Sequence, residues 1–125
     1  MTKEQCIEYI STEYGVQPDF PFEKYPDIYI FRHKTNRKWF VILITVNASL
    51  LGRKEKKDVW TIGVKCDPLI RASFLSQKGV YTAYHMNKEH WLTVCLDEVS
   101  DEDFKTLVDI SFDLTKQKTK KRKSA

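Results

Sequence analysis

One stretch of the sequence concentrates side chains that can do chemistry. Residues 84–91 read Tyr-His-Met-Asn-Lys-Glu-His-Trp, which places two imidazoles, an amide, a lysine and two large rings in one segment. Flat rings stack on bases, and the donors and the cation suit an anionic ligand or a peptide. The same residue types also suit a structural corner, in which Tyr84 and Trp91 close the end of the core and Asn87 adopts a strained turn conformation. The sequence leaves both interpretations open.

The chain has no group of residues typical of an enzyme. Cys66 and Cys95 lie in predicted strands, where a thiol is usually a small apolar side chain. The four glycines form no phosphate-binding loop, and the sequence contains no Gly-x-Ser-x-Gly. His85 and His90 are five residues apart across a turn, and no pair of thiolates or carboxylates completes a set of metal ligands. We therefore expect a non-enzymatic protein with no metal and no cofactor.

Length and composition predict one globular domain. The chain has 125 residues, of which 42% are hydrophobic and 13% aromatic, enough to form a core. No apolar run reaches the roughly 18–20 residues that a membrane span requires, and the N-terminus lacks the pattern of a signal peptide. Three cysteines without a repeated spacing fit a reducing compartment. We expect a cytoplasmic protein that does not associate with membranes.

The net charge of +4 arises at the C-terminus. Residues 116–125 contain six basic side chains and no acidic one, whereas residues 1–115 contain 15 basic and 17 acidic side chains, a formal charge of −2. The sequence thus predicts a single domain over residues 1–115 and a disordered basic tail over residues 116–125. Such a tail either binds polyanions or simply keeps the protein in solution.

Before the loop, the sequence predicts one helix and three strands. Thr2 and Gln5 have the spacing of a capping box, and the helix that they begin ends at Gly15. A connection with three prolines follows. The predicted strands are residues 28–33, 39–46 and 59–66. The middle strand is apolar on both faces, so its second face requires another layer, the aromatic side chains of loops, or a second subunit.

Around the loop, the sequence predicts a helix and two more strands. Asp67 followed by proline predicts a helix start, and Gly79 predicts a residue with positive φ that ends this helix. Residues 80–84 are then extended. Residues 92–97 alternate, so their leucines and valine lie on one face of a strand and the threonine and cysteine on the other.

A last helix is predicted from Ser100, whose side chain caps it, to about residue 115. Ser111 interrupts its apolar stripe, and we expect the hydroxyl to bond a carbonyl one turn back in the same helix. These elements together predict an α+β fold. It is a two-layer sandwich in which an antiparallel sheet of about five strands packs on three main helices.

Several of these segments resemble the MmcQ/YjbR family. The resemblance is carried by Lys65-Cys66-Asp67-Pro68, by residues 83–91, by Leu96-Asp97 and by the sequence DISFDL at residues 109–114. It implies a small bacterial domain of α-β3-α-β2-α type, similar in layout to type III secretion chaperones. It also implies DNA binding through two hairpin "wings".

Two charged turns are natural candidates for the wings. They are residues 32–38 and residues 47–58, which lie at opposite ends of a meander, about 25 Å apart for strands of this length. The candidate nucleic-acid-binding residues are Arg37, Lys38, Arg53, Lys54, Lys56, Lys57 and Lys88. The candidate recognition loop contains Tyr84, His85, Asn87, His90 and Trp91, with Lys65 and Arg71 near it. Lysines and arginines on hairpin tips also keep proteins in solution and protect sheet edges, which is the alternative interpretation.

The sequence therefore predicts a non-enzymatic, DNA-binding domain that contacts phosphates through hairpin tips and the tail. The alternative is a protein-interaction or chaperone-like module. It would use the second face of the sheet to form a homodimer or to hold a segment of a client protein.

Overall fold

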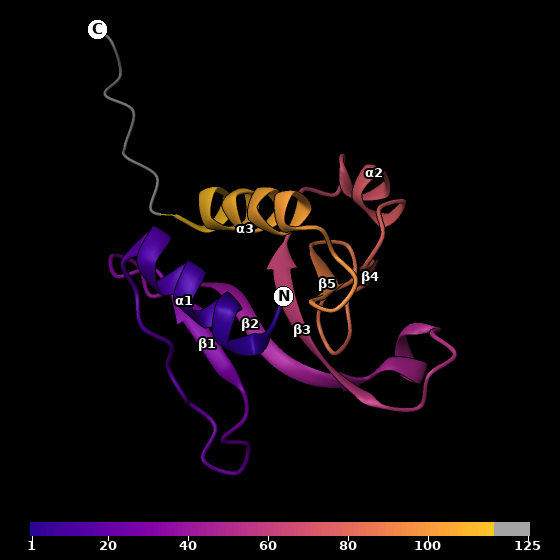
Figure 1. Cartoon of the computed structure of the whole chain (residues 1–125). Coiled ribbons are helices and arrows are strands. Elements are labelled where there is room, and N and C mark those ends of the chain that lie inside the picture. Colours follow the sequence, from indigo (N-terminus) through magenta and orange to yellow (C-terminus); the bar gives the residue numbers. More distant parts are fainter. Residues whose placement is uncertain (117–125) are drawn as a thin grey trace, which may run out of the picture.

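The computed structural model describes residues 1–116 as a five-stranded antiparallel sheet with three α-helices (Figure 1). In chain order the elements are α1 (Lys3–Tyr14), β1 (Tyr29–Arg32), β2 (Trp39–Asn47), the short 3-10 helix η1 (Ala48–Leu51), β3 (Asp58–Lys65), α2 (Arg71–Leu75), β4 (Val80–Thr82), β5 (Trp91–Cys95) and α3 (Asp101–Thr115). The predicted α+β fold is confirmed. In the described part of the chain, no helix is both long and apolar enough to cross a bilayer.

The two long helices begin where their capping residues predict. The Thr2 hydroxyl accepts from the backbone N–H of Gln5 at 3.1 Å, and the Gln5 side chain accepts from the backbone N–H of Thr2 at 2.9 Å. This reciprocal pair satisfies two N–H groups that the helix itself leaves free. Ser100 caps α3 through the N–H of Asp103, and Gly15 ends α1 in the left-handed conformation, with φ 65°.

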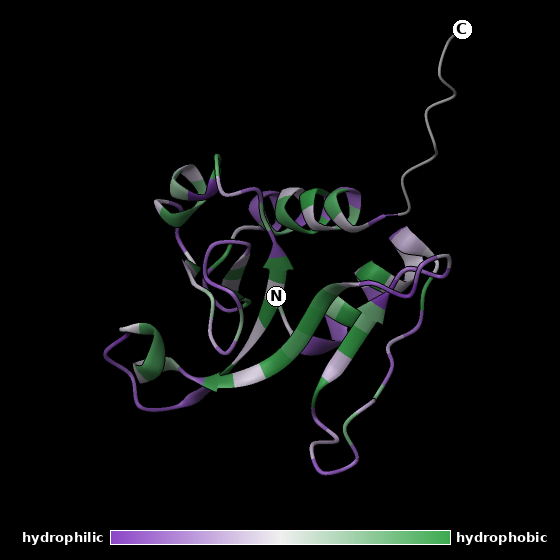
Figure 2. Ribbon diagram, turned by 180° about the vertical axis from the view of Figure 1, so that it is seen from behind, coloured by the Kyte–Doolittle hydropathy of each residue, from purple (hydrophilic) through white to green (hydrophobic). Residues whose placement is uncertain are grey.

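The sheet is a meander followed by a two-strand addition, in the order β1-β2-β3-β5-β4. The hairpin between β1 and β2 and the longer connection between β2 and β3 lie at opposite ends of β2 (Figure 1). Because β4 is the last strand and pairs only with β5, one of its edges is unpaired within the sheet. Hydrophobic residues dominate the strands, and hydrophilic residues dominate the connecting loops (Figure 2).

The main core lies between one face of the sheet and the helices α1 and α3. Both helices and all five strands contribute to it. Its largest fully buried side chains include Ile10, Phe31, Phe40, Leu43, Ile62, Leu92, Phe104 and Leu107. The predicted alternation in β5 is confirmed, because Leu92 and Val94 join this core whereas Cys95 belongs to a smaller cluster with Ala48 and Val59. Burial of this apolar area is the main stabilising contribution to the fold.

The second face of the sheet is covered by loops of the same chain. Ile42 and Gly63 are register partners, and they alternate with strand residues of the main core, so they face the other side. A Cβ added at Gly63 would lie 3.0 Å from Sδ of Met86, which places the 84–88 loop directly over this face. Ile42 is accordingly only 7% exposed. Of the three covers that the sequence allowed, loop side chains cover this part of the face.

The helix predicted from Asp67 is shorter and begins later than expected. Oδ1 of Asp67 accepts from the N–H of Leu69, so the side chain closes a turn rather than capping a helix, and α2 has only five residues. Gly79 has the predicted positive φ, 87°, but it lies four residues beyond the end of α2. It is instead packed under the turn after β5, where an added Cβ would lie 2.7 Å from the backbone nitrogen of Val99.

The hydrogen bond predicted for Ser111 is wrong. Its hydroxyl donates to the carbonyl of Phe40 at 2.6 Å and accepts from the backbone N–H of Lys65 at 2.8 Å. Val41 pairs with Val64 in the β2–β3 ladder, so Phe40 and Lys65 are the next residues that face each other along it. Ser111 bridges their backbone groups. The hydroxyl therefore continues the ladder and fixes α3 to the sheet. It is Thr115 that bonds a carbonyl one turn back, that of Ser111.

Candidate functional site

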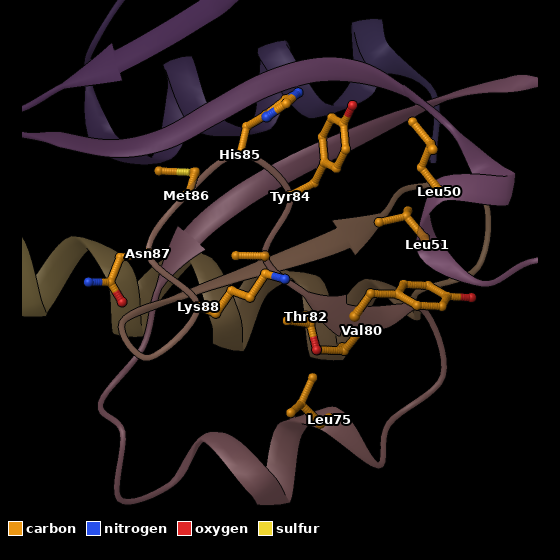
Figure 3. A pocket seen from close by; sticks show the side chains of 12 residues that line it. Leu50, Leu51, Leu75, Val80, Thr82, Tyr84, His85, Met86, Asn87 and Lys88 are labelled. Atoms are coloured by element: carbon orange, nitrogen blue, oxygen red, sulfur yellow. The ribbon is translucent and has the colours of Figure 1, made fainter.

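A cleft of about 870 Å³ opens along the unpaired edge of β4 (Figure 3). We call it the edge cleft. Its twelve lining residues come from η1, from the end of α2, from β4 and from the loop that follows β4. They are Leu50, Leu51, Leu75, Val80, Tyr81, Thr82, Ala83, Tyr84, His85, Met86, Asn87 and Lys88.

Apolar side chains flank the edge of β4 on both sides. In Figure 3, Leu75 lies on one side of Val80 and Thr82, and Leu50 and Leu51 lie on the other. Leu50 is 59% exposed, so its side chain presents apolar surface to solvent. Both walls are therefore apolar, with a strand edge between them.

The polar side of the edge cleft is made by the 84–88 loop. The rings of Tyr84 and His85 lie side by side, with centroids 3.9 Å apart. The N–H of Tyr84 donates to Oγ1 of Thr93 at 3.0 Å, which ties the start of the loop to β5. Of the lining residues, only Lys88 is a lysine or arginine, and none is an aspartate or glutamate. The cleft thus combines apolar walls with donors and one positive charge.

The structural-corner interpretation placed a strained turn conformation at Asn87, but that conformation is found at His85. His85 has φ 59°, in the left-handed region that side chains other than glycine rarely adopt, although histidine does so more readily than most. Asn87 forms an ordinary turn, in which its side chain accepts from the N–H of Glu89 at 2.8 Å. Strained residues cluster at functional sites, and His85 lines the edge cleft, so its conformation favours a functional role for the cleft.

The edge cleft contains some of the predicted recognition residues and not others. Tyr84, His85 and Asn87 line it, together with Lys88. His90 and Trp91 do not. They are held by backbone bonds, since the His90 carbonyl accepts from the N–H of Cys66 and the N–H of Trp91 donates to the Asn87 carbonyl. Lys65, which pairs with Trp91, and Arg71, the first residue of α2, also lie outside the lining.

The first predicted wing is fixed to the end of α3. His33 is 4% exposed, and its Nε2 lies 2.8 Å from the hydroxyl of Thr115, the last residue of α3. The Asn36 amide donates to the backbone carbonyl of the same threonine at 2.8 Å. Burial lowers the pKa of His33, so the neutral ring is favoured at this junction. The sequence did not indicate this contact, because His33 and Thr115 are 82 positions apart.

The tip of this hairpin presents cations to solvent. Lys34, Arg37 and Lys38 are all exposed, and we call residues 34–38 the basic hairpin tip. Arg37 has φ 62°, and its guanidinium lies 3.1 Å from Oδ2 of Asp19. Arg37 is thereby partly neutralised, whereas the structure shows no ion pair for the two lysines among residues 1–116.

In the second predicted wing, Arg53 is engaged within the chain. Its guanidinium lies 2.9 Å from Asp97, 3.2 Å from Glu55 and 3.3 Å from Glu98, and its side chain is only 8% exposed. Arg53 lowers the pKa of the Asp97 carboxyl, as expected for an ion pair with direct hydrogen bonds. Arg53 therefore positions the connection between β2 and β3. The exposed cations of this wing are Lys54, Lys56 and Lys57.

The same ion-pair network occupies a cluster with metal-ligand chemistry. Cys95, Asp97 and Glu98 have ligand atoms within 4.8 Å of one another. Both carboxylates already face the Arg53 guanidinium, so a cation occupies the cluster. Burial raises the pKa of the Cys95 thiol to about 11, which keeps it protonated and a poor ligand. Among the described residues, this arrangement is a structural ion pair and gives no support for a metal site.

Comparison with known proteins gives consistent matches along most of the chain. A model of the YjbR family matches residues 12–114. The Bacillus subtilis (strain 168) protein named "Uncharacterized protein YyaQ" is 32% identical over 117 residues, covering 93% of this chain and 99% of that protein. A crystal structure of a Pseudomonas syringae protein has a TM-score of 0.89 and 39% identity, covering 93% of this chain and all of the other.

Two further structures extend the comparison. A solution NMR structure from Pseudomonas syringae has a TM-score of 0.88 and 37% identity, covering 98% and 99% of the two chains. A Deinococcus radiodurans protein has a TM-score of 0.65 at 21% identity, covering 91% of this chain and 82% of that one, and shares the fold.

Proposed function

The chain belongs to the YjbR family, and we propose that it is a non-enzymatic DNA-binding domain that contacts phosphates mainly at one end of the molecule. This end consists of the basic hairpin tip and the cations that follow Thr115 in the sequence. The proposal keeps the DNA binding that the family resemblance implies. It replaces two equivalent wings by one principal site.

The junction at Thr115 carries this proposal. His33 and Asn36 hold Thr115 beside the hairpin, so the chain leaves the described domain next to Lys34 and Lys38. Figure 1 shows the end of α3 at the same end of the molecule as the β1–β2 hairpin. Two sources of positive charge thus start from one place, although Asn36 and Thr115 are 79 positions apart in the sequence. Clustered cations bind the phosphate backbone through release of its counterions.

Charge distribution favours one end over two. Residues 1–115 have a formal charge of −2, so the body of the domain does not attract DNA as a whole. In the second wing, Arg53 is paired with three carboxylates and contributes no free charge. The two tips are also separated by the nine residues of β2, roughly 30 Å, which prevents them from forming one continuous surface.

Binding of a short fluorescent duplex, measured by anisotropy at several salt concentrations, tests the proposal. Matched variants compare the two tips: Lys34→Gln with Lys38→Gln at the first, and Lys54→Gln with Lys56→Gln at the second. Each lost phosphate contact reduces the slope of log K against log salt by about 0.9. We expect the first pair to reduce it by about 1.8 and the second pair by less than half as much. Replacing the five basic residues after Lys116 by glutamine should reduce it most.

Two outcomes contradict the proposal. Equal effects of the two lysine pairs would restore two equivalent wings, and no duplex binding by the full chain at low salt would remove the DNA-binding function altogether. The alternative, a homodimer or client segment on the second face of the sheet, has less support. Around Ile42, the second face is already covered by Met86 of the same chain.

A further inference from the structure

The edge cleft is not used by the proposed contacts with DNA. It lies beside β4 and η1, whereas the basic hairpin tip joins β1 to β2 at the other side of the sheet. Its walls are apolar, its only lysine is Lys88, and a strand edge runs between the walls. These features must be explained separately.

Backbone groups of β4 point outward along this edge. The N–H of Cys95 donates to the carbonyl of Gly79, so residues 79 and 81 face β5 and residues 80 and 82 face away from it. The N–H of Val80 is used by Gln77 within the chain. The carbonyl of Val80 and both backbone groups of Thr82 therefore point away from β5, and Thr82 is exposed. An extended chain placed there finds one donor and two acceptors.

We propose that the edge cleft binds an extended peptide segment of a partner protein, which adds a short strand beside β4 and directs an acidic side chain toward Lys88. Strand addition at a free edge derives affinity from main-chain hydrogen bonds and specificity from pockets for alternate side chains. β4 has only three residues, so the added strand is short.

The two walls fit the alternation of a bound strand. Successive side chains of an added strand point to opposite faces of the sheet. One set meets Leu75 of α2, and the other meets Leu50, Leu51 and the ring of Tyr84 (Figure 3). The segment recognised is therefore apolar at neighbouring positions, with one side of the strand held by each wall.

Charge selects the remaining feature of the peptide. Lys88 is exposed and forms no ion pair among the described residues, and no carboxylate lines the edge cleft. An aspartate or glutamate next to the apolar positions pairs with Lys88, whereas a basic residue there is repelled. A second copy of the chain is less suited, since a three-residue edge is short for a continuous sheet between two domains.

Selection from a phage-displayed library of random nine-residue peptides tests the proposal with the full chain as bait. We expect enrichment of peptides with adjacent apolar residues and an acidic residue. A selected peptide is then synthesised and titrated against the protein. Thr82→Pro removes the outward N–H of β4, at an edge position where a sheet tolerates proline, and should weaken binding about tenfold or more. Thr82→Val keeps that N–H and is the matched control, with affinity expected within about twofold.

Lys88→Glu is a second, independent variant at an exposed position. This variant should weaken the binding of the selected acidic peptide. It should strengthen the binding of the same peptide with its acidic residue replaced by lysine. Failure to enrich any peptide, binding unaffected by both Thr82→Pro and Lys88→Glu, or occupation of the edge by a second copy, seen as a dimer in sedimentation, would each overturn the proposal. Duplex binding by Thr82→Pro should remain unchanged, so this proposal and the DNA-binding proposal fail separately.

Discussion

The bridge made by Ser111 gives the sharpest test of how α3 is attached to the sheet. Replacement by alanine removes the acceptor of the Lys65 N–H and the donor to the Phe40 carbonyl in one step. Ser111 and Phe40 are both fully buried, so water does not replace the bond to the carbonyl. Ser111→Ala should therefore destabilise the protein although it deletes a single oxygen atom.

The magnitude follows from the two groups left without partners. A buried acceptor without a partner costs about 1–3 kcal/mol, and the Lys65 N–H adds less because Lys65 is only half-buried. The higher helix propensity of alanine offsets about 0.5 kcal/mol of this loss. The free energy of unfolding should fall by about 2–3 kcal/mol. For a domain of this size, that corresponds to a decrease in Tm of roughly 8–12 °C.

Urea unfolding followed by tryptophan fluorescence measures this change, since the chain has three tryptophans. Thr106→Ala, at an exposed position of α3, is the matched control and should stay within about 0.5 kcal/mol of the unmodified protein. A serine that only bonded a carbonyl of its own helix would cost about 0.5 kcal/mol or less on replacement. A loss that small for Ser111→Ala would refute the bridge between helix and sheet.

Three further outcomes are expected. Gly79→Ala should lower the free energy of unfolding in urea by about 3 kcal/mol, and Gly52→Ala by only about 1 kcal/mol. Both glycines have φ 87°, but only at Gly79 would an added Cβ meet backbone, 2.7 Å from the nitrogen of Val99. Equal losses would contradict the packing of Gly79 under the turn. Burial lowers the pKa of His33, so the unfolded chain binds its proton first and stability should fall as the pH decreases below about 6.5. The fall should be smaller in His33→Gln, and identical profiles would show that the ring is not buried. Arg53→Gln should raise the pKa of Asp97 toward its ordinary value of about 3.9, measured by NMR titration, and an unchanged pKa would exclude the ion pair.

Local sequence patterns predicted most of the secondary structure. The capping box at Thr2, the cap at Ser100 and the three strands of the meander all agree with the structure to within about a residue. These features depend on hydrogen bonds and apolar alternation over a few neighbouring residues, which the sequence displays directly. The family was also evident from the sequence, because the segments that carry the resemblance are read without knowledge of the fold.

The candidate sites were only partly predictable. Tyr84, His85, Asn87 and Lys88 stood out by residue type, and they do line the edge cleft. Its leucines did not, because an apolar residue in a charged turn usually signals only packing. The signal available was the pair of leucines in η1, which a single glycine separates from a run of charged residues, but nothing in the sequence connected this pair with the edge of β4.

The amino-acid sequence determined which segments become helices and strands, that the basic residues gather at the C-terminal end, and to which family the protein belongs. Only the tertiary structure decided that Ser111 bridges two strands, that Arg53 is paired with Asp97 and that Thr115 lies beside the first hairpin. Each of these contacts joins residues that are more than 40 positions apart along the chain. Hydrogen bonds and ion pairs depend on distance in space, and packing of helices on the sheet fixes that distance only once the whole domain has folded.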